Sequence, residues 1–479
     1  MIKKSSFFLI ITCSIIWPLS IFYNWSSDFG IYYSMGNLID NDYRLYKESW
    51  DTKGPVYFFF LKVIGEIIGK GVWQSYISLI VTTLFYLVSL FFIINKFVKN
   101  DLAKLFLVIL SIASLNFQYA TSSIAIFQSS LYIFSYYFLI RSIESKNSYP
   151  FLLSTILLSA AILTRIDAIV YSFVFFFAFI ILLKGSKSKL KFILLLIAFN
   201  FLLVFFFFSF YGFNITEFYQ ANIDHYRQFA VPSNIKTKIY ILIYRTDQLI
   251  ELSLQGILPS FILILGIIFF NKFYKKIDLK NNIIIFSLVF FGVIFSIYSE
   301  SPSYRHANIF VTPILFLIIY YLGKIQIKNK FVLILPGLLF LIISLVFYTM
   351  TIKKVFLSDC YKNIFCENSN YKQSKKTIEE VNKLKNVDVI GSNGWIYVFT
   401  DAKPNLSIVN WNLYFNANFY PTEYTINQHN DLISRKRGSN LWINKLILNN
   451  PNPTIYLNEV INHYQFVEDQ GLFFKYKKK

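Results

Sequence analysis

The sequence predicts an α-helical polytopic membrane protein with about eleven transmembrane helices and a small extracytoplasmic α/β domain at its C-terminus. Of its 479 residues, 55% are hydrophobic and only 15% are charged, whereas globular proteins average about 45–50% and about 25%. Long apolar runs recur along most of the chain, and the charged residues gather between them. This composition excludes a soluble enzyme and a disordered chain.

The apolar runs are long enough to cross a bilayer, which takes roughly 20 residues per helix. Phe192–Phe213 and Phe331–Ile352 contain no charged residue. Phe151–Leu183 has room for two passes, with a turn at Arg165 and Asp167 between them. The remaining candidate spans are Phe7–Tyr23, Tyr76–Ile94, Leu105–Tyr119, Ile124–Ile140, Leu254–Phe270, Ile283–Ser299 and Ile309–Leu322.

The basic residues predict how the chain is oriented. Its net charge of +20, from 46 basic and 26 acidic residues, is of the kind that can indicate a nucleic-acid partner. Here, however, the basic residues cluster in short loops on one side of the alternating spans, and such loops prefer the cytoplasm. We therefore expect a cytoplasmic N-terminus in the cytoplasmic (inner) membrane, and no nucleic-acid partner. The loop residues are Lys3, Lys4, Lys96, Lys99, Lys104, Arg141, Lys146, Lys184, Lys187, Lys189, Lys191, Lys272, Lys275, Lys276, Lys280, Lys324, Lys328 and Lys330.

The topology divides the chain into a transmembrane domain and an outer tail that is long enough for a small domain. Cys360 and Cys366 lie close together in that tail. An oxidising compartment would let them form a disulfide, and free thiols are the alternative. The predicted boundaries are residues 1–352 for the transmembrane domain, 24–75 and 214–255 for its outer loops, and 353–479 for the extracytoplasmic domain.

Two apolar segments near the N-terminus need a separate interpretation. Met1–Tyr23 has the basic start and apolar middle of a signal peptide, but no small-x-small cleavage site precedes Trp25, which predicts a retained membrane anchor. Val56–Ile68 is interrupted by Lys62 and Glu66. We expect this second segment to be a helix that lies at the membrane interface.

Alternating helical and extended patterns predict a small α/β layer in the tail. Gln470 and Gly471 are the turn signal of a hairpin that joins Phe466–Val467 to Phe473–Tyr476. The other predicted elements are helices at Ser374–Lys385, Trp395–Phe399 and Asn440–Leu448, and strands at Val387–Gly391 and Pro453–Leu457.

Charged side chains near membrane depth are costly and are often functional. On the outer side these include Asp28, Asp51, Lys53, Arg165 and Arg305. A carboxylate there can act as a general base toward a hydroxyl, and Lys or Arg can hold a phosphate. Structural roles are the alternatives, such as a helix-capping Asp51 or a snorkelling Arg305. No Walker loop, dinucleotide fingerprint or zinc-protease helix is present, so we expect neither nucleotide-driven nor zinc chemistry.

Further polar groups could contact a substrate. Asp224 and His225 in the second outer loop are suited to a sugar or an acceptor, although a surface helix explains them equally well. Tyr304 and His306 flank Arg305 at the outer end of a late span. We assign no metal-binding set of residues, although Asp28 and Asp51 could share a divalent cation.

Several short segments together carry a family resemblance. They are Ser27–Tyr33 and Trp50–Tyr57 in the first outer loop, Ser159–Arg165, Tyr304–His306 with Pro313, and the tail segments Asp388–Gly391 and Trp395–Tyr397. This pattern resembles the GT-C superfamily of polyprenyl-phosphate-sugar-dependent glycosyltransferases, in the branch of the aminoarabinose and protein mannosyltransferases. The resemblance covers the whole architecture, and it implies a GT-C-like fold.

The resemblance also implies roles for individual residues. Asp28 occupies the position of the family's catalytic aspartate, and Asp51 is a candidate for a second carboxylate. Lys53 corresponds to the lysine that binds the donor phosphate, although Gly54 stands between it and the proline. In the implied single displacement, Lys53, Arg165 and Arg305 stabilise the leaving phosphate.

The function that this resemblance implies is transfer of a sugar to a lipid, glycan or protein acceptor at the outer face of a prokaryotic cytoplasmic membrane, with inversion. The donor is a sugar linked to polyprenyl phosphate, and membrane lipids are the other partners. A flippase or transporter of lipid-linked glycans, or a glycan polymerase or ligase, is the alternative. The absence of an internal repeat disfavours a transporter, and the early position of the acidic cluster disfavours a polymerase or ligase.

Overall fold

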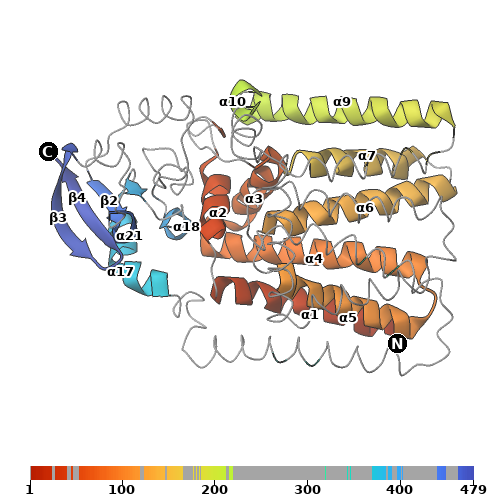
Figure 1. The fold of residues 1–479 in the computed structure, drawn as a ribbon, viewed down its shortest axis with the longest axis horizontal. Helices are drawn as coiled ribbons and strands as arrows, with labels where there is room; N and C mark the ends of the chain where they lie inside the picture. Colours follow the sequence, from red (N-terminus) through yellow and green to blue (C-terminus); the bar gives the residue numbers. More distant parts are fainter. Residues whose placement is uncertain are drawn as a thin grey trace, which may run out of the picture. The chain divides into compact units, whose positions relative to one another are not determined.

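The computed structural model describes the N-terminal half of the chain and parts of the tail (Figure 1). The chain divides into two compact units. The first unit comprises Met1–Pro18, Ile80–Leu203 and Tyr226–Met350, and the second comprises Leu19–Leu79, Val204–His225 and Thr351–Lys479. The described residues are 2–23, 27–39, 45–46, 53–118, 123–145, 148–165, 185–211, 215–219, 369–384, 387–390, 396–400, 440–448 and 462–479, with single positions at 176, 180, 183, 315, 319, 342, 346 and 402.

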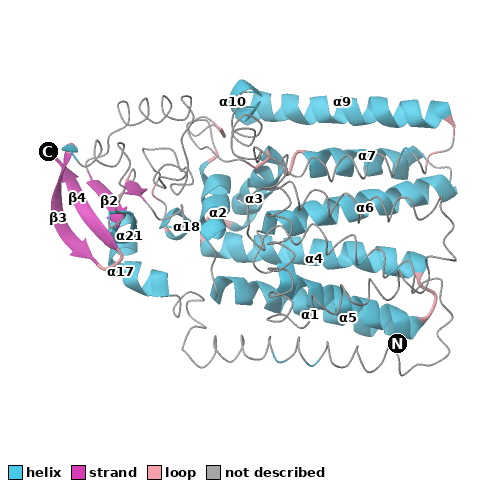
Figure 2. Ribbon diagram, viewed as in Figure 1, coloured by secondary structure: helices cyan, strands magenta, loops and turns pink. Residues whose placement is uncertain are grey.

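Most of the described chain is helical, and one small sheet lies near the C-terminus (Figure 2). The N-terminal helices are α1 (Ile2–Tyr23), α2 (Ser27–Leu38), α3 (Pro55–Ile68), α4 (Val72–Phe97), α5 (Asp101–Gln118), α6 (Ser123–Ser145), α7 (Ser148–Ile162), α9 (Ser186–Tyr211) and α10 (Ile215–Tyr219). The tail contains α17 (Ser369–Val381), β1 (Asp388–Ile390), α18 (Ile396–Phe399), β2 (Asn440–Asn444), α21 (Lys445–Leu448), β3 (Tyr464–Gln470) and β4 (Phe473–Lys478).

Several of these helices have the length and composition of membrane spans. Among the described residues, Trp73–Phe97, Ser123–Ser145 and Ser186–Phe207 each have at least 22 residues, and an 18-residue stretch of each has a mean hydropathy of 2.5, 1.4 and 2.6, respectively. Large apolar side chains on α9, including Phe201 and Phe205, are exposed. An exposed apolar face on a helix of this length suits contact with lipid. The predicted fold class of a helical membrane protein with a small α/β tail is therefore confirmed.

The predicted spans coincide with helices wherever the structure describes them. Tyr76–Ile94 lies within α4, Ile124–Ile140 lies within α6, and the break expected at Arg165 follows the end of α7. The structure differs at α4, which begins at Val72, inside the loop predicted to end at Ser75. The predicted spans after residue 250 lie outside the described residues, apart from single helical positions.

Small polar residues hold α6 and α7 together in the first unit. The Ser135 hydroxyl donates to the Ser154 carbonyl oxygen at 2.7 Å, and the Ser154 hydroxyl donates back to the Ser135 carbonyl oxygen at 2.8 Å. Asn200 on α9 donates to the Ser159 hydroxyl at 3.1 Å. Small residues let helix backbones approach closely in a membrane, and their hydroxyls then find partners on the neighbouring helix.

The sheet of the tail has the strand order β1-β2-β4-β3. β1 and β2 are parallel, whereas β4 is antiparallel to both of its neighbours, β2 and β3. The predicted hairpin is confirmed as β3 and β4, joined at Gly471. The predicted helix at Trp395–Phe399 is confirmed as α18, and the strand at Val387–Gly391 as β1. Pro453–Leu457, Cys360 and Cys366 lie outside the described residues.

One predicted element of the tail is wrong. We predicted a helix at Asn440–Leu448, but Asn440–Asn444 forms strand β2 and only Lys445–Leu448 is helical. Leu441, Trp442 and Ile443 are all buried, so both faces of β2 are covered, and β2 is also paired on both edges, with β1 and β4. A strand covered on both faces has no alternation of polar and apolar residues, and its sequence pattern cannot be distinguished from that of a short buried helix.

A buried amide connects α17 to this sheet. Gln470 is 3% exposed, and its Nε2 donates to Glu380 Oε1 at 2.9 Å and to Glu468 Oε1 at 2.7 Å. Its Oε1 accepts from Trp442 Nε1 at 2.8 Å and from Thr377 Oγ1 at 3.1 Å. The amide has therefore satisfied both its donors and both its acceptor sites, which is what burial of such a group requires.

Carboxylates around this amide make the tail sensitive to acid. Burial raises the pKa of Glu380, but hydrogen bonds from Lys475 and Gln470 outweigh burial and hold that pKa below its ordinary value. Hydrogen bonds from Lys376 and Gln470 lower the pKa of Glu468. A lowered pKa in the folded state contributes stability at pH values above the ordinary pKa of about 4.3, and this contribution is lost as the pH falls below it.

We therefore expect amide protection in α17, corrected for intrinsic exchange, to be constant from about pH 7 to about pH 5 and to fall below about pH 4.5. Hydrogen exchange followed by mass spectrometry on the full chain measures it. The variant Lys475→Met removes the cation that contacts Glu380 at 2.7 Å, so it should lower protection at neutral pH and reduce the loss in acid. Protection that is unchanged down to pH 3 would contradict this expectation.

Candidate functional site

The segment predicted to be the first outer loop contains two helices, α2 and α3, which pack against each other in the second unit. α2 was not predicted, because its sequence mixes Ser, Asp, Gly and Asn among apolar residues. From Tyr32 to Ile39 its described side chains are nevertheless buried. The predicted helix at Val56–Ile68 is confirmed as α3, with Pro55 at its first position. Packing against α3 therefore explains why α2 is helical.

The two helices run parallel and touch closely. Near the beginning of both helices, the Tyr32 ring lies edge-on to the Tyr57 ring, with 6.2 Å between the centroids. One turn later, a Cβ built on Gly36 would lie 2.5 Å from Leu61 Cβ. Only glycine permits this approach, because real Cβ contacts are never that short. The register of these contacts therefore aligns the N-termini of α2 and α3 at the same end of the pair.

This register places two of the first-loop residues of the predicted site, Asp28 and Lys53, at the same level of the helix pair. Asp28 is the second residue of α2, one turn before Tyr32, and Lys53 lies about one turn before Tyr57. Continuing the register by one turn toward both N-termini places position 28 level with position 53. A carboxylate position and a lysine position that are separate in sequence thus lie at the same end of one helix pair.

The segment at Lys53 is held in place through its backbone. The Tyr46 hydroxyl donates to the Lys53 carbonyl oxygen. Tyr46 is completely buried, its ring lies edge-on to Phe218 at 5.1 Å, and its φ of 72° falls in the left-handed region. A non-glycine residue with this φ is strained and persists only where its surroundings impose it. No sequence signal had singled out Tyr46, because its role depends on this tertiary contact.

The start of α3 itself favours an anion. The N-cap of α3 is Gly54, which has an extended conformation and no side chain that could cap the helix. The capping position is therefore not Asp51, for which helix capping was the structural alternative. Pro55 occupies the first turn. The free N–H groups and the partial positive charge of a helix N-terminus attract phosphate. The half-buried Lys53 adjoins this helix end and adds a full positive charge.

Lys62 has a structural role that its sequence context did not indicate. Its Nζ donates to the carbonyl oxygen of Ile39, just beyond the end of α2, at 2.5 Å. The same Nζ lies 3.4 Å from Glu66 on the next turn. Lys62 therefore links the end of α2 to the middle of α3, and it fixes the parallel pair that carries Asp28 and Lys53.

Arg165, in the first unit, is 8% exposed and follows the end of α7. Gln128 on α6 fixes this chain end, because its Nε2 donates to the carbonyl oxygens of Ala161 at 2.8 Å and of Arg165 at 3.2 Å. These two carbonyl groups lie at the C-terminus of a helix, where such groups lack helical partners. Gln128 is thus a positioning residue for Arg165, and the sequence did not reveal it.

The other predicted site residues lie outside the described residues. These are Asp51, Asp224, His225, Tyr304, Arg305 and His306. Within the part of the chain that the structure describes, no group of three or more His, Cys, Asp or Glu residues could hold a metal ion. A divalent cation shared by Asp28 and Asp51 stays a prediction.

The long apolar helices and the small C-terminal sheet define a helical membrane protein. The family described as dolichyl-phosphate-mannose-protein mannosyltransferase matches residues 52–210, from just before α3 to the end of α9. Two solved structures of ArnT from Cupriavidus metallidurans are similar to nearly the whole chain. The structure bound to undecaprenyl phosphate shares 9% identity at a TM-score of 0.58, covering 98% of this chain and 97% of that one. The apo structure shares 11% identity at a TM-score of 0.52, covering 94% and 93%.

This family match spans about a third of the chain, and together with the two ArnT structures it supports the resemblance to the GT-C membrane glycosyltransferases. The fold is shared with ArnT over almost the full length of both chains. Among curated proteins, none matches this sequence. The fold that the resemblance implied is therefore confirmed.

Proposed function

We propose that this protein transfers a sugar from a polyprenyl-phosphate donor to a lipid, glycan or protein acceptor at the outer face of the cytoplasmic membrane. The observation that carries the proposal is the parallel packing of α2 and α3, which sets position 28 level with the anion-binding start of α3 at Lys53. The shared fold with ArnT, which has been solved with undecaprenyl phosphate bound, supports the class of donor.

The proposed reaction is a single displacement with inversion. Asp28 accepts the proton of the acceptor hydroxyl as its oxygen attacks the anomeric carbon of the sugar. The bond from that carbon to the phosphate oxygen breaks, and its electron pair leaves with the polyprenyl phosphate. Lys53, together with Arg165 and Arg305, stabilises the negative charge on the departing phosphate.

The remaining site residues complete this proposal. Asp51 is the candidate second carboxylate, and a divalent cation between it and Asp28 would further stabilise the phosphate. Asp224, His225, Tyr304 and His306 are candidates for contact with the sugar or the acceptor. The lysine-rich loops are assigned to the cytoplasm, which places the first loop on the outer side.

A binding experiment on the full chain in nanodiscs tests the donor site. We expect undecaprenyl phosphate to bind and Lys53→Met to weaken this binding about tenfold, because one charge-assisted contact is lost. Lys99→Met is the matched control, since Lys99 is an exposed lysine that follows α4 in the first unit. Equal affinity in wild type and Lys53→Met, or no binding at all, would contradict the site.

A transfer assay separates an enzyme from a transporter. Proteoliposomes are loaded with undecaprenyl-phosphate mannose and are supplied with membrane extract as the source of acceptors. An enzyme releases undecaprenyl phosphate only when acceptor is present. Movement of the intact donor across the bilayer without cleavage would instead indicate a flippase and overturn the proposal.

A further inference from the structure

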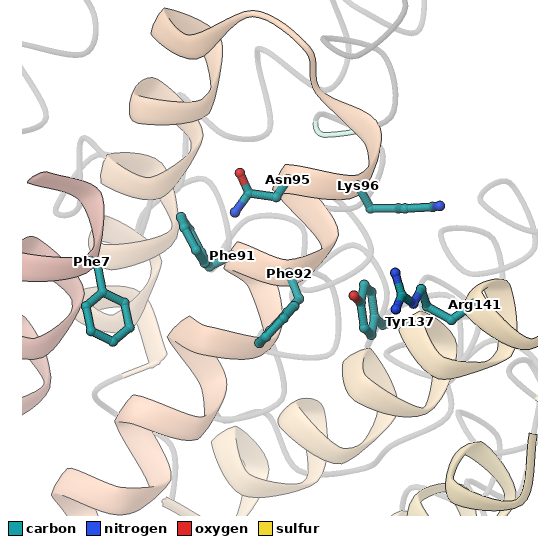
Figure 3. Close-up of a pocket in the computed structure, with 7 residues that line it drawn as sticks. All are labelled: Phe7, Phe91, Phe92, Asn95, Lys96, Tyr137 and Arg141. Carbon is teal, nitrogen blue, oxygen red and sulfur yellow. The ribbon is translucent and has the colours of Figure 1, made fainter. Parts of the chain in front are cut away.

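A cavity in the first unit lies well away from the region of Arg165. Its volume is about 580 Å³, and it opens between α1 and the last turns of α4 and α6 (Figure 3). Gln128, which bonds to the Arg165 carbonyl, lies near the start of α6, whereas Arg141 in the cavity lies 13 residues further along the same helix. At 1.5 Å per residue, about 20 Å of helix separates them. The cavity is therefore distinct from the region of Arg165.

One part of this cavity is aromatic. Phe7 from α1 faces Phe91 and Phe92 from α4, and Tyr137 from α6 continues the wall (Figure 3). The Phe92 and Tyr137 rings lie 5.1 Å apart. Phe7 is 50% exposed and Phe92 is 41% exposed. Accessible aromatic surface of this kind offers apolar contact area to a ligand.

The other part of the cavity is polar and positively charged. Lys96 from α4 and Arg141 from α6 lie on the same side of it, and Asn95 points into the opposite side (Figure 3). Lys96 forms an ion pair with Glu144. The guanidinium of Arg141 is exposed and has no acidic partner among the described residues. A planar guanidinium that is accessible and not paired with a carboxylate is suited to hold a phosphodiester through two hydrogen bonds.

Two further lysines follow Lys96 in the sequence. Lys99 lies just after α4, and Lys104 lies in the first turn of α5, where it forms an ion pair with Asp101 at 3.1 Å. The distribution of basic loops predicts that both lysines lie at the cytoplasmic surface of the membrane. Anionic lipids are concentrated in that leaflet. A ligand that combines an anionic head with an apolar chain matches both halves of the cavity.

We propose that this cavity binds an anionic glycerophospholipid of the membrane leaflet that faces the lysine-rich loops. Arg141 holds the phosphodiester with Lys96 beside it, one acyl chain lies along Phe7, Phe91 and Phe92, and the Asn95 amide on that side bonds to an ester oxygen of the chain. The site does not depend on the proposed glycosyltransferase activity. It would couple the stability of the α1–α4–α6 packing to the lipid composition of the membrane.

Native mass spectrometry of the purified full chain, with graded additions of lipid, tests this proposal. We expect phosphatidylglycerol to bind more tightly than phosphatidylcholine, and Arg141→Gln to weaken phosphatidylglycerol binding about tenfold. Lys187→Gln is the matched control, because Lys187 is an exposed lysine at the start of α9 and does not line the cavity. Phe7→Ala should weaken both lipids, because it removes part of the apolar wall.

Three outcomes would overturn the proposal. The first is equal binding of the two lipids to wild type. The second is a Lys187→Gln effect as large as that of Arg141→Gln, which would indicate diffuse surface charge. The third is binding of glycerophosphoglycerol, the headgroup without acyl chains, as tightly as the lipid. Arg141 and Phe7 are both exposed, so these variants should fold, and size-exclusion chromatography with circular dichroism checks that they do.

Discussion

Replacing Asp28 by asparagine is expected to lower sugar transfer at least about 100-fold while leaving donor binding within about threefold of wild type. The amide is almost the same size as the carboxylate, so the start of α2 should remain folded. It cannot accept the proton of the acceptor hydroxyl, because an amide is not a base at neutral pH. The loss should appear in kcat, since the proton is transferred in the transition state and not on binding. Release of undecaprenyl phosphate from undecaprenyl-phosphate mannose in proteoliposomes measures it.

Glu66→Gln is the matched control for this variant. It also converts a carboxylate to an amide in the first outer loop, but Glu66 is largely exposed on α3 and contacts only Lys62 in the described structure. Exposed ion pairs contribute little, and Lys62 keeps its bond to the Ile39 carbonyl oxygen. Transfer by Glu66→Gln should therefore stay close to wild type. If Asp28→Asn retains turnover within threefold of wild type, Asp28 is not the catalytic base.

Replacing Gly471 by alanine is expected to destabilise the C-terminal hairpin by about 2–4 kcal/mol. Gly471 has a φ of +79°, which an L-residue adopts only at a cost, and its Cβ would lie 2.4 Å from the Gln373 carbonyl oxygen of α17. That oxygen belongs to the backbone and also accepts from the Leu472 N–H at 3.4 Å. The clash can be relieved only by moving the turn away from α17. Hydrogen exchange in the peptides that contain β3 and β4 reports the change.

Gly185→Ala separates the two causes of this effect. Gly185 precedes α9 with a φ of +84°, close to that of Gly471, but a Cβ there would meet nothing within 4 Å. It therefore incurs a backbone cost of about 1–2 kcal/mol without the steric one. We expect a local effect at the start of α9 that is smaller than that of Gly471→Ala in the hairpin. Equal effects would show that backbone conformation alone governs Gly471 and that the contact with Gln373 can relax.

Local patterns in the sequence were sufficient for much of the fold. The spans at α4 and α6 were predictable because a run of about 20 consecutive apolar residues is typical of a transmembrane helix. The hairpin was predictable because Gln470-Gly471 lies between two apolar stretches, and a glycine in a turn can adopt a positive φ. The break after α7 was predictable because Arg165 interrupts an apolar run that is too long for one helix.

Elements that depend on a distant partner were not predictable in this way. α2 has no strong helical pattern of its own, and it is explained by its close packing on α3 at Gly36. β2 was assigned to the wrong class, because its three apolar residues are buried on both faces, and its two edges pair with strands that are distant in sequence. Gln128, Tyr46 and Lys62 act through hydrogen bonds to the backbone of other segments, and no sequence motif indicates such hydrogen bonds.

The sequence by itself determined the membrane-helical class, the superfamily resemblance and the choice of Asp28 and Lys53 as site residues, since all three depend on residue type and local spacing. Only the tertiary structure decided that these two positions share one end of a helix pair. The parallel register of α2 and α3 follows from contacts of Tyr32 with Tyr57 and of Gly36 with Leu61. Such contacts join residues about 25 positions apart. They form because the two helix surfaces have complementary shapes, and a linear pattern of residue types does not specify such a fit.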